Sequence, residues 1–267
     1  MAFPSKRQLS CSLLAKTGIS AGVSWLDFDW PGPAPRGGQF FMIRPKRFSR
    51  FLGRPVSAAG FRRGTLRFLA ARRGAGTAEL LDMGIGDQAE LTGPLGNAWG
   101  DFLPPEAGVL ALVSGGIGIA PLLALVPELA KEGRLFDFYG GFKTAALDDP
   151  PPGPAPSPVQ GLCSEVRPYS RKLVLATEDG SEGLRGRIPV FFEPGAYRAV
   201  FACGPEPMLR VITEKCGAAG VPCCVSLERR MACGVGACLG CTVETAGGNR
   251  RCCADGPVFP AEEICFL

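Results

Sequence analysis

The sequence of 267 residues contains no histidine, and its charges nearly balance, with 29 basic and 25 acidic residues. Without imidazole, the common schemes of acid–base catalysis and nucleophile activation are excluded. No run approaches the roughly 20 apolar residues that a membrane-spanning helix needs, and the first residues lack the apolar core of a signal peptide. We therefore expect a cytoplasmic protein with no membrane segment, whose chemistry comes from cofactors.

The net charge of +4 is small for a chain of this length. Basic residues are dispersed, apart from two clusters within residues 44–54 and 62–73. The phosphates of a bound cofactor suffice to explain such local clusters, so the charge pattern gives little support to nucleic-acid binding. We expect no nucleic-acid partner.

Cysteine, by contrast, is abundant, and nine of the 12 cysteines lie between Cys216 and Cys265. In a reducing compartment, such crowding favours metal binding over disulfides. Three of the cysteines follow a C-x4-C-x2-C pattern, namely Cys233, Cys238 and Cys241. This pattern, with a further thiol downstream, is the spacing of a plant-type [2Fe-2S] cluster.

The glycines of this loop favour the same interpretation, because a loop around a cluster turns tightly and directs N–H groups at sulfur. Zinc sites more often have two short C-x2-C pairs or histidines, but a zinc site or a disulfide set remains an alternative. The downstream thiols are adjacent, Cys252 and Cys253. Spacing alone does not choose between them as the fourth ligand.

The chain divides into three predicted regions: residues 1–103, 104–220 and 221–267. In the first region, short apolar runs alternate with turn residues, which predicts a small antiparallel barrel. We expect its strands at Leu9–Ala15, Val23–Phe28, Gln39–Ile43, Val56–Phe61, Thr65–Ala70 and Gln88–Thr92.

The second region has the strand, glycine loop and helix of a nucleotide-binding α/β domain. We expect strands at Gly108–Val113, Leu135–Tyr139, Leu173–Thr177 and Ala199–Cys203, with helices at Pro121–Lys131 and Glu206–Ala219. The proline-rich segment Asp148–Pro158 is expected to lack regular structure. The third region, residues 221–267, contains the cysteine loop and is expected to form a small cluster-binding module.

A glycine loop follows the first strand of the second region and contains Gly115, Gly116, Gly118 and Pro121. Between a strand and a helix, such a loop lets a pyrophosphate approach backbone N–H groups and the positive helix end. Proline replaces the last glycine of the common G-x-G-x-x-G pattern, and a tight structural turn is the alternative interpretation.

Two further segments follow later strands, at the sheet edge where α/β proteins bind ligands. The segment with Cys203, Gly204, Pro205 and Met208 is placed to border a nicotinamide, or else forms a turn with a buried thiol. Glu178 and Asp179 would repel a ribose 2′-phosphate, which favours NADH over NADPH, unless they form only a solvated turn.

The barrel region contains two candidate phosphate-binding segments. Arg54, Pro55, Val56 and Ser57 combine an arginine, a rigid proline and a small hydroxyl at a strand start, which suits a diphosphate and a flavin ring. Such an arginine is also common on ordinary surfaces. Gly76-Thr77 leads into an expected helix and offers a second phosphate-binding turn.

The order of these motifs resembles a known family, the electron-transfer subunits of two-subunit, NAD-dependent dihydroorotate dehydrogenases in the ferredoxin reductase superfamily. The motifs are R-P-x-S, G-T, G-P-L-G-N, G-G-I-G-I-A-P, T-E-D-G-S, C-G-P-x-x-M-L and the cysteine loop. They span nearly the whole chain. The segment Ser226–Cys238 is the most specific part of the resemblance.

The resemblance implies FAD bound by Arg54–Ser57, by Leu69, Ala70 and Ala71, and by Gly76-Thr77. It implies a [2Fe-2S] cluster on Cys233, Cys238, Cys241 and Cys253, because Cys253 precedes the Asp255–Phe259 run of the family. Ala70 and Ala71 lack the aromatic and basic side chains often found there, which leaves that contact to backbone atoms. The residues 148–158 and 163–171 replace a helical stretch expected in the NAD domain.

The resemblance further implies an electron relay between NAD(H), FAD, the cluster and an FMN-containing dihydroorotate dehydrogenase subunit, in a heterotetramer with two copies of each. One alternative is a related subunit linked to ferredoxin, sulfide or a hydrogenase. Those relatives often have aspartate at the position of Cys233. Another alternative is a redox sensor or zinc-binding module without catalysis.

Overall fold

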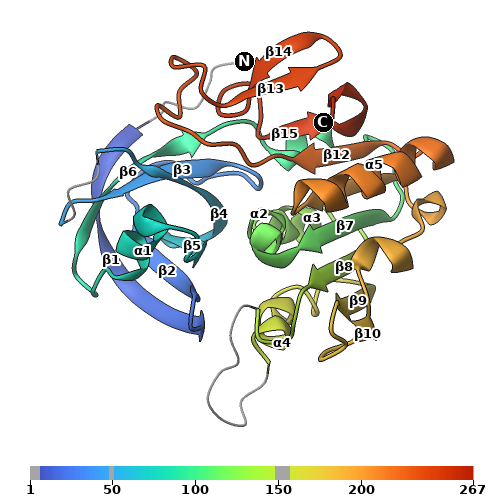
Figure 1. The fold of residues 1–267 in the computed structure, drawn as a ribbon, viewed down its shortest axis with the longest axis horizontal. Coiled ribbons are helices and arrows are strands. Elements are labelled where there is room, and N and C mark those ends of the chain that lie inside the picture. Colours follow the sequence, from blue (N-terminus) through green and yellow to red (C-terminus); the bar gives the residue numbers. More distant parts are fainter. Residues whose placement is uncertain (1–6, 48–50, 148–156, 267) are drawn as a thin grey trace.

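The computed structural model describes residues 7–47, 51–147 and 157–266. A closed antiparallel barrel lies beside a seven-stranded sheet covered by helices, and the cysteine-rich segment lies over both (Figure 1). The fold class predicted from the sequence is confirmed. The division of the chain into three domains remains a prediction.

The barrel closes in the order β1-β2-β5-β4-β3-β6. All six predicted strands are present, and each is longer than predicted. They are β1 (Arg7–Ser20), β2 (Val23–Asp29), β3 (Phe40–Pro45), β4 (Arg54–Arg62), β5 (Thr65–Ala71) and β6 (Gln88–Leu95). The helix α1 (Ala75–Leu81) follows β5, as expected from the Gly76-Thr77 pair.

The barrel interior is filled by aromatic side chains. The ring of Phe41 makes edge contacts with Trp30 and Phe68, at centroid distances of 5.0 and 5.6 Å. Phe28 extends the cluster through Phe68 at 6.1 Å. Such ring contacts stabilise the fold beyond what the burial of their apolar area contributes. The barrel is therefore a rigid support for the site on its rim.

The second sheet has the order β10-β9-β8-β7-β11-β12-β15, and all its pairs are parallel except β12 with β15. Its strands are β7 (Leu110–Gly115), β8 (Phe136–Phe142), β9 (Lys172–Thr177), β10 (Leu184–Arg185), β11 (Ala199–Cys203), β12 (Cys223–Ser226) and β15 (Val258–Pro260). The last two strands come from residues 221–267. The cysteine-rich region is therefore hydrogen-bonded into the sheet. A separate hairpin pairs β13 (Thr242–Thr245) with β14 (Gly248–Arg251).

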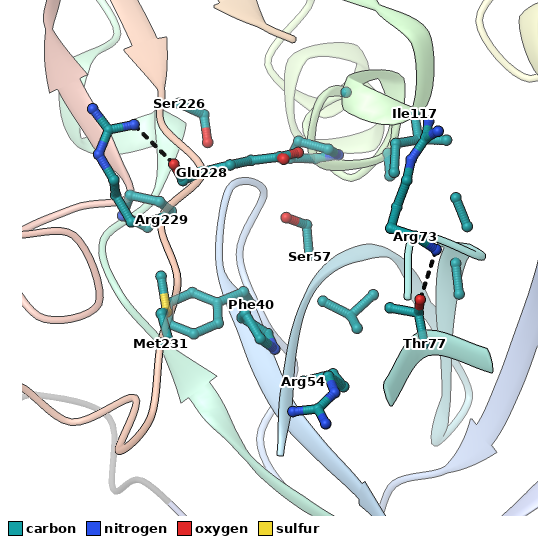
Figure 2. A pocket seen from close by; sticks show the side chains of 18 of the residues that line it. Phe40, Arg54, Ser57, Arg73, Thr77, Ile117, Ser226, Glu228, Arg229 and Met231 are labelled. Atoms are coloured by element: carbon teal, nitrogen blue, oxygen red, sulfur yellow. Dashed lines mark hydrogen bonds between the residues drawn. The ribbon is translucent and has the colours of Figure 1, made fainter. Parts of the chain in front are cut away.

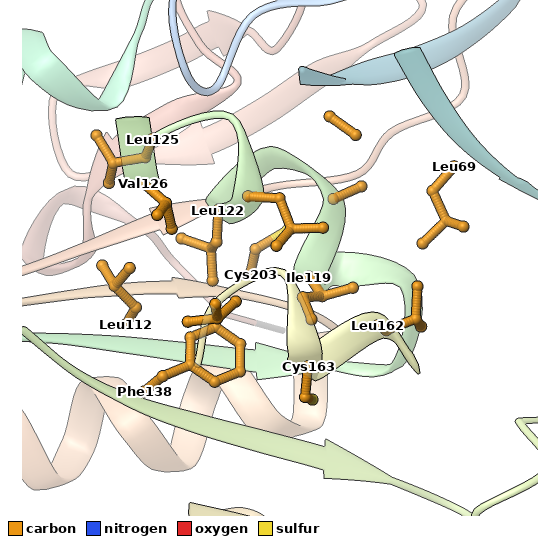
Figure 3. Packing of buried hydrophobic residues seen from close by; sticks show 14 of the residues in the cluster. Leu69, Leu112, Ile119, Leu122, Leu125, Val126, Phe138, Leu162, Cys163 and Cys203 are labelled. Atoms are coloured by element: carbon orange, nitrogen blue, oxygen red, sulfur yellow. The ribbon is translucent and has the colours of Figure 1, made fainter. Parts of the chain in front are cut away.

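Helices cover both faces of this sheet. Leu112 and Phe138 pack with Leu122 and Val126 on the face toward the barrel (Figure 3). The alternate strand residues pack against α5 (Glu206–Ala219) on the other face. None of the helices in the described part of the chain is both long and apolar enough to cross a membrane.

The helix predicted at Pro121–Lys131 is wrong as a single element. The structure has a 3-10 turn (Gly116–Gly118), then α2 (Ile119–Leu123) and α3 (Val126–Lys131). The break has a physical cause, because Pro127 has no N–H and its ring would clash with a carbonyl of the preceding turn.

The expectation that residues 148–158 and 163–171 replace a helix is also wrong in part. Residues 148–156 lie outside the described residues. The helix α4 (Pro158–Ser164) begins at Pro158, and the Ser157 Oγ accepts a hydrogen bond from the Gln160 N–H at 3.1 Å. A serine N-cap followed by proline at the first helical position starts a helix well.

The remaining short helices are 3-10 turns. They are η1 (Trp99–Phe102), η3 (Ile188–Phe191), η4 (Pro194–Ala196) and η5 (Ala261–Glu263).

Candidate functional site

A large cavity lies where the barrel, the sheet and the cysteine-rich segment meet. Its volume is about 670 Å³, within the usual range for a cofactor site. The predicted site residues that line it are Arg54, Pro55, Val56, Ser57, Leu69, Ala70, Ala71, Thr77, Gly118, Pro121 and Cys203. The structure thus brings residues from four separate predicted motifs into one cavity.

The Arg54 guanidinium is held in the mouth of this cavity. Its Nη1 donates to the Leu52 and Gly53 carbonyls at 3.1 and 3.2 Å. A Cβ on Gly76 would lie 1.7 Å from the Arg54 Nε, so a larger residue at position 76 would displace the guanidinium from this place. A fixed guanidinium beside an apolar cavity suits the diphosphate of a dinucleotide.

The turn before α1 is closed by Thr77. Its Oγ1 accepts a hydrogen bond from the Arg73 N–H at 2.8 Å (Figure 2). It accepts a second one from the Gly74 N–H at 3.2 Å. Thr77 therefore fixes the chain at the cavity wall.

The glycine loop and the later Cys-Gly-Pro turn pack against each other. A Cβ on Gly115 would lie 2.6 Å from Pro205 and 2.8 Å from the Met208 Sδ. A Cβ on Gly118 would lie 2.5 Å from the Cys203 carbonyl oxygen. Gly204 contacts Gly115 in the same way, with Gly115 backbone atoms 2.9 Å from an added Cβ. These two turns thus pack backbone against backbone at the carboxyl edge of the sheet, the edge where α/β proteins bind dinucleotides.

Gly116 has a φ of 55°, and a Cβ there would meet no atom within 4 Å. Position 116 therefore favours glycine because of its backbone conformation and not because a side chain would clash with a neighbour. The buried Ser114 Oγ, two residues earlier, has no hydrogen-bond partner among the described residues. A polar ligand would satisfy it.

Glu178 and Asp179 lie apart from this cavity, in the turn after β9. Asp179 accepts hydrogen bonds from the N–H and Oγ of Ser181 at 3.0 and 2.6 Å, and the Oγ bond lowers its pKa. The Glu178 carboxylate is 3.5 Å from the Arg187 Nε. Both carboxylates thus have a partner within the protein, but both are exposed and keep further acceptor positions for a ligand.

Sequence reasoning missed one whole wall of the cavity. Ser226, Glu228, Arg229, Arg230 and Met231 line it from the segment after β12 (Figure 2). The Arg229 guanidinium fixes this segment by donating to the Glu228 carbonyl and to the Glu206 carboxylate, at 2.9 and 3.0 Å. The signal was available, since these residues directly precede Cys233.

The four cysteines expected to bind the cluster form two pairs. The Cys238 N–H donates to the Cys233 Sγ at 3.4 Å, and the Cys253 N–H donates to the Cys241 Sγ at 3.4 Å. The Gly236 N–H donates to the Cys253 Sγ at 3.1 Å and joins the two pairs. All the cysteines are free thiols.

This pairing distinguishes between kinds of metal site. Among the described residues, no three Cys, Asp or Glu side chains gather as one metal ion requires. A tetrahedral zinc ion needs its ligands around one point, whereas two irons each take two thiolates. The two cysteine pairs therefore suit a [2Fe-2S] cluster better than zinc.

The electrostatics of the loop favour a thiolate at Cys233. Burial opposes its ionisation, but hydrogen bonds from the N–H groups of Val235, Cys238 and Ala237 and from the Cys238 side chain together lower the pKa of Cys233 to about 6. Burial and Cys241 raise the pKa of Cys253 to about 12, a value for the protein without the positive charge of iron.

Cys252 and Cys253 point to different surroundings. The Cys252 side chain is fully buried, and its Sγ donates to the Leu227 carbonyl at 3.2 Å. Only Cys253 accepts an N–H from the cysteine loop. This geometry favours Cys253 as the fourth ligand.

Comparison with solved structures places the fold among flavin- and pyridine-nucleotide-dependent reductases. An NADH-dependent reduced ferredoxin-NADP oxidoreductase, studied for flavin-based electron bifurcation, is 27% identical with a TM-score of 0.77, over 96% of this chain and 90% of the other. A ferredoxin NADP+ reductase from Neisseria gonorrhoeae, solved with FAD and NADP, shares the fold at 18% identity, with a TM-score of 0.64, over 84% and 94% of the two chains.

The curated relatives of the chain identify its family more narrowly than the solved structures do. The "Dihydroorotate dehydrogenase B (NAD(+)), electron transfer subunit" of Clostridium perfringens is 40% identical over 86% of this chain and 87% of its own length. The subunit of the same name from Caldanaerobacter subterraneus is 36% identical over 97% and 99%. Residues 228–265 match the iron-sulfur cluster binding domain of dihydroorotate dehydrogenase B. The chain belongs to the family of dihydroorotate dehydrogenase B electron transfer subunits.

Proposed function

We propose that this chain carries electrons between NAD(H) and a catalytic partner, through FAD in the cavity and a [2Fe-2S] cluster in the cysteine loop. The chain is an oxidoreductase subunit, and its family and fold support all three cofactors. One observation carries the proposal: the segment Ser226–Met231 lines the cavity and continues directly into Cys233. The flavin site and the cluster site are thus consecutive on one piece of chain.

The contact between the cluster loop and the barrel supports the same relay. A Cβ on Gly234 would lie 2.5 Å from the Met42 side chain of β3. Phe40, on the same strand, lines the cavity. The loop therefore rests on a strand that also borders the flavin site, which keeps the two redox groups at a fixed separation.

We assign FAD to Arg54, Pro55, Val56 and Ser57, to the strand end Leu69–Ala71, and to Gly76-Thr77. Arg54 would hold the diphosphate, and the small residues Ala70 and Ala71 leave room for a flat ring against backbone atoms. A flavin accepts two electrons as hydride and releases them one at a time, which links a nicotinamide to a one-electron carrier.

We assign NAD(H) to the packed turns that contain Gly115, Gly116, Gly118 and Pro121, and Cys203, Gly204, Pro205 and Met208. Cys203 and Gly118 also line the flavin cavity, so the nicotinamide would meet the flavin there. Glu178 and Asp179 would accept hydrogen bonds from the adenosine ribose and favour NADH over NADPH.

We assign the cluster to Cys233, Cys238, Cys241 and Cys253. The N–H groups directed at their sulfur atoms would stabilise the negative charge of thiolates and cluster. Glycine at positions 234 and 236, with φ of 68° and 87°, lets the backbone turn so that these N–H groups face inward.

We infer that dihydroorotate is oxidised on an FMN-containing partner subunit, and that two copies of each subunit form a heterotetramer. In this arrangement electrons run from dihydroorotate toward NAD+, and NADH is the donor in the reverse assay. The names of the relatives, which describe electron-transfer subunits, support a separate catalytic chain. The cytoplasmic location also stays a prediction.

Anaerobic titration of the purified protein with NADH tests the proposal. We expect the flavin absorbance to bleach and a [2Fe-2S] signal to appear by electron paramagnetic resonance, with iron and acid-labile sulfide in equal amounts. Stoichiometric zinc, or a loaded protein that NADH does not reduce, would contradict the relay. Electron transfer to ferredoxin instead of the FMN subunit would favour the ferredoxin-linked alternative.

A further inference from the structure

Of the described residues that line the flavin cavity, Glu228 is the one carboxylate, among arginines, apolar residues and the hydroxyls of Ser57, Thr77 and Ser226. We propose that Glu228 is the group that exchanges the flavin proton with solvent during each turnover. This inference rests on the proposed function and adds a chemical role to a residue of the Ser226–Cys238 segment for which the sequence predicted none.

The proton balance of the relay creates the need for such a group. A hydride from NADH brings two electrons and one proton to the flavin, but the cluster carries electrons only. Each hydride that enters therefore leaves one proton behind, which breaks its bond to the flavin as the two electrons leave singly. In the opposite direction, two electrons arrive through the cluster and one proton is taken up before hydride passes to NAD+.

The other titratable groups of the cavity are poor proton acceptors. Four are arginines, which stay protonated in proteins. The remaining one is the thiol of Cys203, and burial followed by the charge of Glu228 raises its pKa far above the neutral range. The sequence contains no histidine, so no imidazole takes this role.

The position of Glu228 is well defined. Its backbone lies between two anchors, the Leu227 N–H bonded to the Pro257 carbonyl at 2.9 Å and the Arg229 guanidinium bonded to the Glu228 carbonyl at 2.9 Å. Figure 2 shows the Glu228 side chain extending into the cavity above Ser57. Within the described part of the chain, no hydrogen bond or ion pair engages its carboxylate, so its oxygens are available to a ligand or water.

The surroundings of Glu228 raise the pKa of its carboxyl above that of an ordinary glutamate. Although the Glu228 side chain is exposed to the open cavity, the protein atoms around its carboxylate desolvate it and raise its pKa, and the opposing charge of Arg73 lowers the pKa by less. The other groups that face it are Cys203 from β11 and Cys252 from the segment after β14, both of which burial keeps neutral. A raised pKa brings the carboxylate closer to the working pH, where general acids and bases are most effective.

The holoprotein with Glu228→Gln tests this role against the parent. Hydride brings its own proton, so NADH should bleach the FAD of the variant at the parental rate. Anaerobic re-oxidation by ferricyanide, a one-electron acceptor, should slow about a hundredfold, as expected for loss of a general base. The parental re-oxidation rate should rise with pH through the Glu228 pKa, and the variant should lose this dependence.

Infrared difference spectra between the oxidised and reduced holoprotein give an independent readout. We expect a protonated-carboxyl signal in the parent that is absent in Glu228→Gln and shifted in Glu228→Asp. Glu228→Asp should also keep its FAD and re-oxidise at an intermediate rate. Glu132→Gln, an exposed carboxylate at the end of α3, should match the parent throughout.

If Glu228→Gln re-oxidises at the parental rate at every pH, or if it keeps the carboxyl signal of the parent, the inference is overturned and the relay stays intact. Loss of FAD from both Glu228 variants would overturn it as well, because the residue would then serve flavin binding. Failure of NADH to bleach the parental FAD would instead overturn the proposed function, and the inference with it.

Discussion

The Gly236 N–H donates a hydrogen bond to the Cys253 Sγ across 3.1 Å. This bond joins the glycine-rich loop to a segment 17 residues later in the chain. It favours Cys253 over the adjacent Cys252 as the fourth ligand, because the Cys252 thiol is directed instead at the Leu227 carbonyl. The choice that spacing left open thus has a geometric basis.

The two cysteines should respond differently to substitution. Cys253→Ser should lose most of the bound iron and sulfide and the electron paramagnetic resonance signal of the cluster. Cys252→Ala should keep the cluster but lower the free energy of unfolding by about 1–3 kcal/mol, since it leaves a buried carbonyl without its donor. Iron analysis and urea unfolding measure the two effects. Equal iron loss in both variants would contradict this assignment.

Gly76 and Gly74 form a matched pair for testing the FAD site. Gly76→Ala would drive a methyl group into the Arg54 guanidinium, so FAD affinity should fall about tenfold, equal to roughly 1.4 kcal/mol. A Cβ on Gly74 meets no atom within 4 Å, so Gly74→Ala should bind FAD like the parent. Flavin fluorescence during reconstitution measures both affinities. Tight FAD binding by Gly76→Ala would exclude Arg54 as a diphosphate ligand.

Glu178 should contribute to the preference for NADH. Glu178→Gln removes a charge that repels a 2′-phosphate and leaves Arg187 without its carboxylate partner. We expect the NADPH-to-NADH ratio of kcat/KM to rise about fivefold, as for a partly screened charge pair. Glu182→Gln is the control, because Glu182 binds Ser157 and Gln160 instead. No change in the ratio would place the ribose elsewhere.

Glu90 should make the barrel sensitive to acid. A hydrogen bond from Arg44 is the main cause that holds the Glu90 pKa below its ordinary value. A lowered pKa stabilises the fold above the unfolded-state pKa of about 4.3, and this stability is lost as the pH falls through the folded-state value. Urea unfolding of the parent and Glu90→Gln should therefore differ near neutral pH and converge in acid. A difference that persists in acid would show that charge is not its source.

Local patterns in the sequence predicted the elements whose side chains are uniformly buried or regularly amphipathic. The bounds of β11 and α5 agree with the prediction, because an apolar run and a helical period are local signals. The sequence signal for the break between α2 and α3 is also local, because Pro127 alone predicts it.

Other features depend on contacts between distant parts of the chain. The antiparallel pairing of β15 with β12 joins residues 258–260 to residues 224–226, and no local period encodes it. The cavity wall at Glu228 was missed for the same reason. Its glutamate sits in a polar run that resembles any exposed segment until the fold places it opposite Ser57.

The place of β12 in the sheet has a consequence for dividing the chain. A fragment that ends at residue 220 would keep the glycine loop and β11 but lack β12. The edge of β11 that pairs with β12 in the whole chain would then be unpaired. An unpaired apolar strand is a template for aggregation. The nucleotide-binding half should therefore aggregate when produced alone, because the iron-sulfur segment completes its sheet as well as carrying the cysteine loop.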